Sequence, residues 1–331
     1  MLNYLPMTKK IVSICVRAII SLGLILILLY IMRGKYSQIW DAIRGANALY
    51  LGLGFVAFVV ALTLAAIRLK LIIDAQGAGQ ATVPEAISLT FIGYFFNNFL
   101  PTSIGGDVAK AYYLSRKSSD KLGSFTSVVV DRAMGLITMI LMAAIALLFA
   151  QGQVVDVNVR YMIYTITFLA ILGTVFLMNK NFAKKFSILL IIIRPIEDKV
   201  RRLYNAVHLY KKHTSLIVKS FIISIFSQLF FFVSIGILAV SVGSIIPPMD
   251  ILMRMPIICA MSLLPSINGL GVREGSTVVL FGPIIGKENA FVVSILWLLV
   301  LFLTSIIGGI IYAFSPQFKI KWGEVERKEA I

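Results

Sequence analysis

Apolar residues in this chain gather in long runs that are separated by short polar segments. Crossing a bilayer core of about 30 Å takes roughly 20 helical residues. The first run is too long for the apolar part of a signal peptide, and no small-residue cleavage site follows it, so we interpret it as a retained span. The runs predicted as full transmembrane helices are 11–32, 49–73, 123–150, 160–178, 216–241 and 290–314.

Two further segments, 84–115 and 250–286, do not fit as simple spans. Each has a short apolar arm, a Leu-Pro break, a glycine-bearing bend and a second arm that starts with charged residues. Proline interrupts a helix because it lacks a backbone donor, and glycine permits the turn that follows. The breaks are expected at Pro101 and Pro265, and the turns at Gly105, Gly106, Gly269 and Gly271.

The composition is typical of a protein embedded in lipid. Hydrophobic residues make up 59% of the 331 residues and charged residues only 14%, too few for the surface of a soluble domain. The net charge of +16 would suit nucleic acid, but ten of the 31 basic residues lie within 180–219, the longest connection between predicted spans, and we expect no platform of interleaved basic and aromatic residues there. We therefore expect no nucleic-acid partner. The basic connection 179–215 is predicted to stay on the cytoplasmic side, near anionic headgroups.

The distribution of basic residues also orients the other segments. With 179–215 in the cytoplasm, both termini are predicted to be cytoplasmic, including the tail 315–331. Segment 84–115 must then begin and end on the cytoplasmic side, and segment 250–286 on the outer side. Both segments are therefore predicted to be re-entrant helical hairpins, in which irregular backbone is surrounded by protein or water.

The two bends align with each other without a gap. The sequence LPTSIGGDVAKA (100–111) lies over LPSINGLGVREG (264–275), and the same offset moves 123–150 close to 290–314. Each half would be span, span, hairpin, span, with the halves at 11–150 and 160–314. The predicted fold is thus a single all-α polytopic membrane domain over 1–331, with six full spans and two re-entrant hairpins in an inverted-topology repeat. Such repeats build alternating-access transporters.

The bends also place polar and charged groups where lipid would exclude them. Such groups mark functional cavities, and the first N–H groups of the helix after each bend suit a phosphate. Lys110 aligns with Glu274, which suggests an ion pair between the halves that forms and breaks. The residues of the expected lipid-headgroup site are Asn97, Asn98, Gly105, Gly106, Asp107, Lys110, Asp131, Arg132, Asn268, Gly271, Arg273 and Glu274.

Structural interpretations of the same residues stay open. The glycines and prolines can serve packing alone, and polar residues can join neighbouring helices. Long basic side chains at a span end can reach the interface as anchors. The residues with such alternatives are Asp131–Arg132 as a structural pair and Asn97 and Asn98 as interhelical hydrogen-bonding groups. Arg68 and Lys70, at a span end, are predicted to be interfacial anchors.

Little in the sequence suggests metal or cofactor chemistry. Cys15 and Cys259 lie in apolar segments, and His208 and His213 stand in the basic connection without a ligand cluster, so we expect no metal, no cofactor and no catalytic residue. The motif GxxxxGK[ST] is absent, so ATP-driven pumping is not expected. An apolar stripe over 196–210 predicts an amphipathic helix on the inner leaflet or an ordinary linker helix.

Both bends resemble a known family. NNFLPTSIGGDVAKAYYL and LLPSINGLGVREG are similar to paired signatures of the transmembrane domain of lysylphosphatidylglycerol synthases, part of a wider flippase-like family, and Asp131–Arg132 is similar to its acidic–Arg pair. The resemblance covers essentially the whole chain and implies a prokaryotic cytoplasmic membrane. It carries over Asp107, Lys110, Arg273 and Glu274 as site residues, although the family often has Arg at the position of Lys110.

In bifunctional members of that family, a cytosolic domain transfers lysine from tRNA to phosphatidylglycerol, and the membrane domain flips the product. Only about seventeen residues follow the last predicted span here, so we expect no aminoacyl-transfer domain. The resemblance implies that this chain is a lipid translocase for an anionic phospholipid or lipid-linked sugar. Movement would run down a gradient or couple to an ion through Asp107 or Glu274.

Two other functions remain open at this point. The first is a membrane-embedded lipid-modifying transferase, for which Asp107 or Glu274 would be the general base. The second is a non-transporting partner of a glycosyltransferase or synthase, which implies a lipid-modifying enzyme as protein partner.

Overall fold

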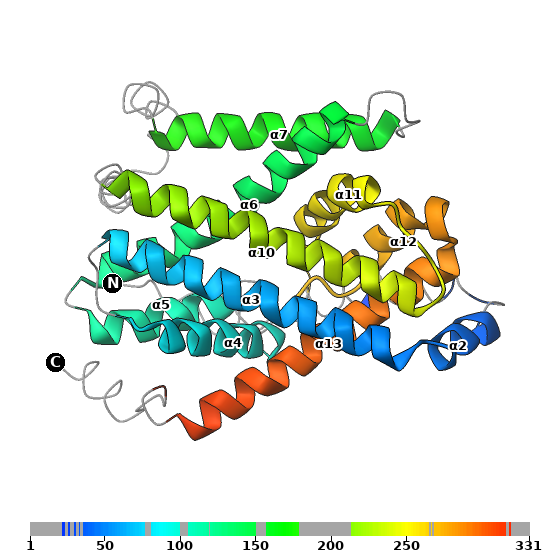
Figure 1. Ribbon diagram of the computed structural model, residues 1–331, viewed down its shortest axis with the longest axis horizontal. Coiled ribbons are helices and arrows are strands. Elements are labelled where there is room, and N and C mark those ends of the chain that lie inside the picture. The colour runs from blue at the N-terminus through cyan, green and yellow to red at the C-terminus, as the bar shows by residue number, and fades with distance from the viewer. Residues whose placement is uncertain are drawn as a thin grey trace.

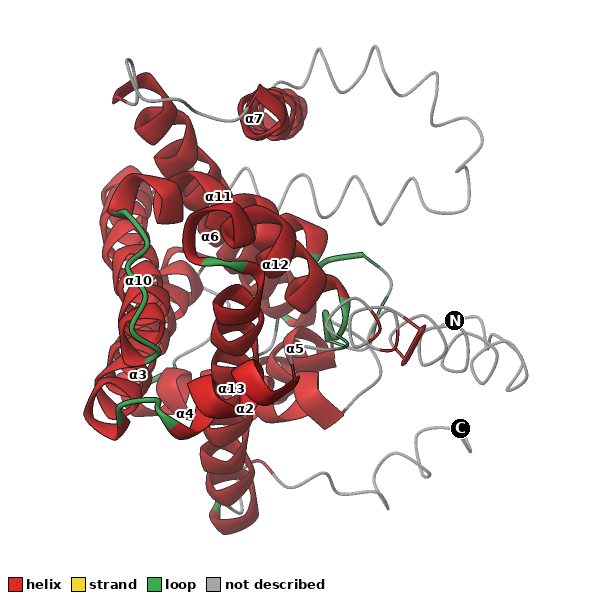
Figure 2. Ribbon diagram, turned by 90° about the vertical axis from the view of Figure 1, so that its right-hand side faces the viewer, coloured by secondary structure: helices red, strands yellow, loops and turns green. Residues whose placement is uncertain are grey.

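In the residues that it describes, the computed structural model consists of helices joined by loops and turns, with no strand (Figures 1 and 2). The described residues are 36–76, 81–99, 105–118, 120–149, 157–178, 213–264 and 268–315, together with the single positions 22, 23, 26, 30, 33, 266 and 318. The helices are α2 (Tyr36–Arg44), α3 (Ala48–Gln76), α4 (Val83–Phe99), α5 (Gly105–Lys117), α6 (Lys121–Phe149), α7 (Val157–Met178), α10 (Thr214–Ser241), α11 (Pro248–Met261), α12 (Val272–Ile285) and α13 (Lys287–Phe314).

Four helices, α3, α6, α10 and α13, are long and apolar enough to cross a membrane. Each has 28 or 29 residues and is therefore about 42 Å long, more than the hydrocarbon core requires. They confirm the helices predicted at 49–73, 123–150, 216–241 and 290–314. α7 covers the predicted segment 160–178 and lies at the edge of the bundle in Figure 2.

Some predictions fall on residues that the structure does not describe. The span 11–32 lies outside the described residues except at four positions, and the connection 179–215 does so except at its last three. Pro101 and Pro265 also lie outside them.

The two segments predicted as hairpins are each a pair of short helices. α4 and α5 have 17 and 13 residues, and α11 and α12 have 14 each, so most arms are only about 20 Å long. In Figure 1 the pairs occupy opposite ends of α10, with α4 and α5 near its start and α11 and α12 near its end. This placement agrees with hairpins that enter from opposite sides. Their sidedness in a membrane, the number of spans and the inverted repeat stay predictions.

α3 and α10 form a closely packed antiparallel pair along one edge of the bundle (Figure 2). Ser227 Oγ donates to the carbonyl of Ala61 at 2.8 Å, and Ser234 Oγ donates to the carbonyl of Gly54 at 2.7 Å. Small side chains seven residues apart on both helices permit this approach, as in other membrane helix pairs. The pair forms one wall of the space between the two hairpins.

α4 packs between α5 and α13, with close backbone contacts on both sides. A Cβ added to Gly106 of α5 would lie 2.0 Å from the carbonyl oxygen of Gly93, and one added to Gly308 of α13 would lie 2.0 Å from that of Phe91. Any larger residue at either position would force the helices apart. The first hairpin is therefore positioned by glycine contacts on two sides.

Candidate functional site

A cavity of about 340 Å³ lies between the two hairpins. Its walls come from α3, α4, α5, α6, α10, α11, α12 and α13, so both hairpins and the long helices contribute. Four basic and two acidic side chains line it, a net charge of +2 that falls to +1 when Glu274, the buried partner of Arg273 behind the lining, is counted. The charged residues that line the cavity are Arg68, Asp107, Lys110, Asp131, Arg132 and Arg273.

Most of the predicted site residues meet at this cavity. The five that do not line it are still placed at the hairpins, where they shape the helix starts or join the arms. The predicted residues that line the cavity are Asn97, Asp107, Lys110, Asp131, Arg132, Asn268 and Arg273, and those that do not are Asn98, Gly105, Gly106, Gly271 and Glu274.

In the first hairpin one carboxylate serves two basic groups. Asp107, in the first turn of α5, forms an ion pair with Arg132 of α6 and lies 3.6 Å from Lys110 Nζ, one turn further along α5. The Asp107 and Lys110 side chains are largely buried, whereas that of Arg132 is 35% exposed. The backbone N–H of Gly106 donates to Asn97 Oδ1 at 2.7 Å, so an amide side chain already caps this helix start.

The glycines of the first bend have a different role from the one predicted. Gly105 and Gly106 are the first residues of α5, and neither is among the described residues with positive φ. The expectation that they form the turn is therefore wrong. The close contact of Gly106 with Gly93 explains the missing side chain there, since a Cβ would overlap the α4 backbone.

In the second hairpin the turn glycines behave as predicted. Asn268, Gly269 and Gly271 have φ of 49°, 77° and 81°, in the left-handed region that glycine and asparagine tolerate best. α12 begins directly afterwards at Val272, as expected. The turn therefore carries little backbone strain, because glycine and asparagine occupy its positive-φ positions.

The start of α12 already holds an anion of the protein itself. Glu274 Oε2 accepts the Gly271 N–H at 2.6 Å, and Oε1 accepts Arg273 Nε and Nη2 at 3.1 and 2.6 Å. Both side chains are about 4% exposed. The place where a helix N-terminus was expected to bind phosphate is therefore occupied by a carboxylate.

The tips of the two hairpins touch through asparagines. Asn268 Nδ2 donates to Asn98 Oδ1, and Asn98 Nδ2 donates to Ser305 Oγ at 2.5 Å and to the Leu301 carbonyl at 3.2 Å on α13. Asn98 therefore acts as an interhelical hydrogen-bonding group, one of the two interpretations left open. Asn97 joins α4 to α5 by capping α5 and also lines the cavity, so its role as a headgroup ligand stays a prediction.

The suggested ion pair between Lys110 and Glu274 is not formed in this structure. Lys110 lies against Asp107, and Glu274 is held by Arg273 and by the turn. Asp131 and Arg132, which are adjacent in sequence, pair with different helices rather than with each other. Asp131 joins α6 to α3, and Arg132 joins α6 to α5.

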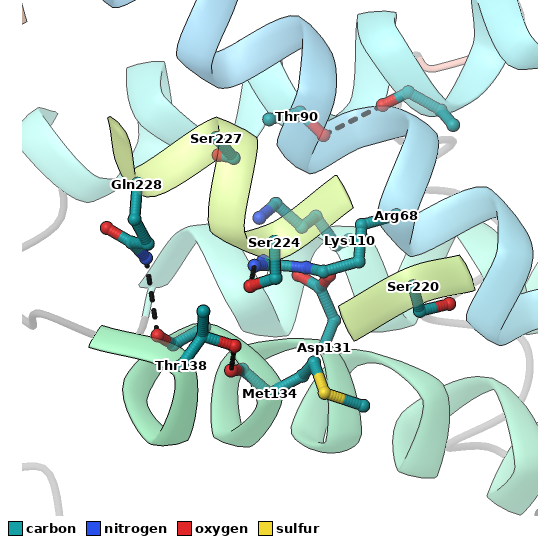
Figure 3. A network of polar contacts seen from close by, with 12 residues as sticks. Arg68, Thr90, Lys110, Asp131, Met134, Thr138, Ser220, Ser224, Ser227 and Gln228 are labelled. Atoms are coloured by element: carbon teal, nitrogen blue, oxygen red, sulfur yellow. Dashed lines mark hydrogen bonds and ion pairs between the residues drawn. The ribbon is translucent and has the colours of Figure 1, made fainter. Parts of the chain in front are cut away.

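Arg68 is the charged residue that the sequence analysis placed wrongly. It is only 6% exposed, so it is no interfacial anchor; Nε donates to Asp131 Oδ1 at 2.7 Å, and Nη1 donates to Ser224 Oγ at 2.9 Å. Figure 3 shows it reaching from α3 to these partners, with Lys110 drawn beside them. Gly135 leaves room, since a Cβ there would lie 3.1 Å from Arg68 Nη1.

A sequence signal for Arg68 did exist. It follows Ala61 by seven residues and Gly54 by fourteen, and both of these lie on the face of α3 that packs against α10. Lys70, by contrast, is half-buried and pairs with Asp74 one turn along α3. No comparable signal marked Trp297, a cavity residue within an apolar run.

Comparison with known proteins agrees with this picture of a membrane domain. A family model described as "Lysylphosphatidylglycerol synthase TM region" matches residues 15–309, which is the greater part of the chain. No curated protein matches the chain.

Proposed function

The chain belongs to the lysylphosphatidylglycerol synthase TM region family, and from that premise we propose that it is a lipid translocase. It moves a phosphate-bearing lipid, an anionic phospholipid or a lipid-linked sugar, between the two leaflets. The observation that carries this proposal is the cationic cavity between two helical hairpins inside an apolar bundle. A membrane protein keeps uncompensated charge in its interior only at a cost, and so the charge indicates a ligand.

The size of the cavity suits a headgroup and not a whole lipid. Its volume of about 340 Å³ lies near the lower end of small-molecule sites, roughly 300–1,000 Å³. The acyl chains would then stay in the surrounding bilayer while the headgroup passes through the protein. This division of the lipid is what a translocase needs.

The phosphate position favoured by charge is beside Lys110 and Arg132. These two basic groups share Asp107, so together they carry one positive charge more than their carboxylate neutralises. Arg132 offers a planar fork of donors to phosphate oxygens, and Lys110 adds a compact charge. A lipid phosphate would take over hydrogen bonds that Asp107 now makes.

The arrangement of the hairpins supports a transport cycle. Their tips meet through Asn98 and Asn268 next to the cavity, and their bases lie toward opposite ends of the long helices (Figure 1). Separation of the tips from one side or the other would expose the cavity to either leaflet in turn. Lipid would move down its gradient, or with an ion that protonates or binds Asp107.

The transferase alternative is less well supported by the geometry. Asp107 is held by two basic groups and Glu274 by Arg273 and the turn, so either carboxylate would have to leave its partners to act as a general base. A transferase would convert lipid to a product of new mass. Mass spectrometry of lipid extract incubated with protein and candidate donors separates the two functions.

The proposal is tested by reconstitution in liposomes with acyl-labelled phosphatidylglycerol and a membrane-impermeant quencher. The protein should make inner-leaflet label accessible, and Lys110→Gln should slow this transfer about 10-fold, as expected for loss of one charge-assisted contact. Lys70→Gln is the matched control, because Lys70 does not line the cavity and pairs with Asp74.

Two results would count against the proposal. One is label that stays inaccessible across a broad panel of phospholipids and lipid-linked sugars. The other is equal slowing by Lys110→Gln and Lys70→Gln. Co-purification with a lipid-modifying enzyme, together with no transfer by the protein alone, would instead favour a partner role.

A further inference from the structure

One hydrogen-bond donor of Arg273 has no acceptor among the described residues. The side chain is almost fully buried and lines the cavity, and its Nε and Nη2 both donate to Glu274 Oε1. The remaining nitrogen, Nη1, donates to none of the residues that the structure describes. One edge of a buried guanidinium is therefore available to a ligand.

Trp297 supplies a second unused donor beside it. The residue is only 6% exposed and lines the same cavity, yet its indole N–H has no acceptor within the described part of the chain. The Arg273 guanidinium lies 5.2 Å from the centroid of the indole ring, and the centroid of the Phe231 ring lies 5.6 Å from that of Trp297. Because buried polar groups are nearly always paired, this N–H indicates a missing acceptor.

The charge around these donors differs from that around Lys110. Glu274 neutralises Arg273, and Asp131 in the same way neutralises Arg68. Among the ion pairs of the described residues that line the cavity, only Lys110 and Arg132 share a single carboxylate, that of Asp107, so the positive charge left over in these pairs lies there. Arg273 and Trp297 offer two donors without net charge, which suits an uncharged oxygen acceptor such as a hydroxyl, ether or carbonyl.

A cationic part of a headgroup, such as an ammonium group, would fit badly beside Arg273 and Trp297. An ammonium ion could be attracted by the face of an indole ring. That ring already lies against the Arg273 guanidinium, so a second cation would meet a like charge. The two unused groups are donors, and an ammonium group needs acceptors.

We infer that Arg273 and Trp297 form a second subsite, which binds the uncharged, oxygen-bearing part of a lipid headgroup while its phosphate lies at Lys110 and Arg132. The inference rests on the proposed function, which it deepens by naming the preferred substrate class. That class is a phosphodiester lipid with a polyol or sugar beyond the phosphate. Phosphatidic acid, with its bare phosphate, and phosphatidylethanolamine, with an ammonium group and no hydroxyl or carbonyl beyond the phosphate, lack the group that this subsite recognises.

The test compares acyl-labelled phosphatidylglycerol, phosphatidic acid and phosphatidylethanolamine in the same proteoliposome assay. Trp297→Phe removes the indole N–H and keeps an aromatic ring. It should slow transfer of phosphatidylglycerol about 3- to 10-fold, the effect of one hydrogen bond to an uncharged acceptor. The transfer rates of phosphatidic acid and phosphatidylethanolamine should not change. The ratio of the phosphatidylglycerol rate to either of these rates should therefore fall.

The ratio of rates does not depend on how much protein inserts correctly. Trp40→Phe is the matched control, because Trp40 is exposed on α2 outside the cavity, and it should leave the ratio unchanged. A ratio that Trp297→Phe does not change would overturn the inference even if the protein moves lipid.

A binding measurement keeps the inference testable if Trp297→Phe fails to fold. The chain has three tryptophans, so Trp40→Phe with Trp322→Phe leaves Trp297 as the only one. Its emission should shift with glycerophosphoglycerol and not with inorganic phosphate. Equal responses to both, or none to either, would overturn the subsite. A selective shift without any lipid transfer would support the subsite and count against the proposed translocase, pointing to a water-soluble phosphodiester.

Discussion

The two hairpins carry similar charges and use them differently. In the first, Asp107 and Lys110 lie on α5 and connect to Arg132 on the long helix α6. In the second, Arg273 and Glu274 are neighbours on α12 and neutralise each other's charge, and Glu274 also accepts the Gly271 N–H of the turn. An exchange of partners in the first hairpin therefore changes how two helices are joined, whereas the second hairpin is electrostatically self-contained. Under the proposed function, this difference would place phosphate exchange at the first hairpin and a fixed recognition surface at the second.

The strongest test of the comparison concerns the side from which each hairpin enters. In a variant with Cys15 and Cys259 replaced by serine, single cysteines at the exposed positions Val83 and Lys121 should react with an impermeant reagent from one side of the membrane only. Cysteines at the exposed positions Ile245 and Lys287 should react only from the other side, an all-or-none difference.

The control is the same set of cysteines after the membrane has been permeabilised, when all four should react. Reaction of the two ends of either hairpin from opposite sides would remove the inverted symmetry and the case for a translocation pathway.

The next largest effect is expected when the two carboxylates are neutralised. Glu274→Gln leaves the buried charge of Arg273 without a counterion and should lower the free energy of unfolding by about 3 kcal/mol. Asp107→Asn should lower it by only about 1 kcal/mol, because Arg132 is partly exposed and keeps access to water, and the buried Lys110 lies 3.6 Å from the carboxylate, too far for a direct hydrogen bond. Unfolding by SDS in mixed micelles measures both values.

Lipid binding should also distinguish the two hairpins, with a gain expected from the variant of the first. Asp107→Asn leaves Lys110 and Arg132 without their shared carboxylate and should raise the affinity for anionic lipid, measured by titration in detergent. Equal loss of stability in the two variants would contradict the contrast drawn between the hairpins.

A smaller difference is expected from the glycines of the two bends. Gly106→Ala would place a Cβ 2.0 Å from the Gly93 backbone, so α4 and α5 must separate at a cost of roughly 2–3 kcal/mol. Gly271→Ala, with φ of 81°, should cost about 1 kcal/mol through backbone strain alone. Gly52→Ala is the control, because no heavy atom lies within 4 Å of its added Cβ, and it should be neutral or slightly stabilising. Thermal unfolding in detergent would show the order, and a reversed order would refute these separate roles.

The smallest effect concerns the base of the first hairpin, where Glu85 of α4 pairs with Lys117 of α5. The hydrogen bond from Lys117, followed by that from the Thr82 backbone, lowers the pKa of Glu85 below its ordinary value of 4.5. The pair therefore stabilises the fold above that pH, and its contribution is lost as the pH falls through the lowered pKa. Because Lys117 is 43% exposed, Glu85→Gln should cost less than about 1 kcal/mol at pH 7.

The control for this last prediction is the same comparison at acidic pH. The difference in unfolding midpoint between the wild type and Glu85→Gln should disappear below the folded pKa of Glu85. A difference that persists there would show that the side chain stabilises the hairpin by packing instead of charge.

The sequence by itself determined the helices of the described region and the places where they break. Apolar runs near 20 residues have few alternatives to a helix in lipid, because every backbone N–H and C=O must be paired. For the same reason Leu-Pro and glycine at 100–106 and 264–271 marked the gaps before α5 and α12. Charged residues next to those gaps identified most of the cavity, since charge in an apolar segment is rarely accidental.

Only the tertiary structure decided which of these charges meet. Asp131 pairs with Arg68 and not with its neighbour Arg132, because residues one position apart on a helix face different helices. Gly106 avoids a clash with α4 instead of making a turn, and Trp297 brings to the cavity, from an apolar run, an N–H that no described residue accepts. These roles depend on which helix lies opposite, and no local pattern contains that information.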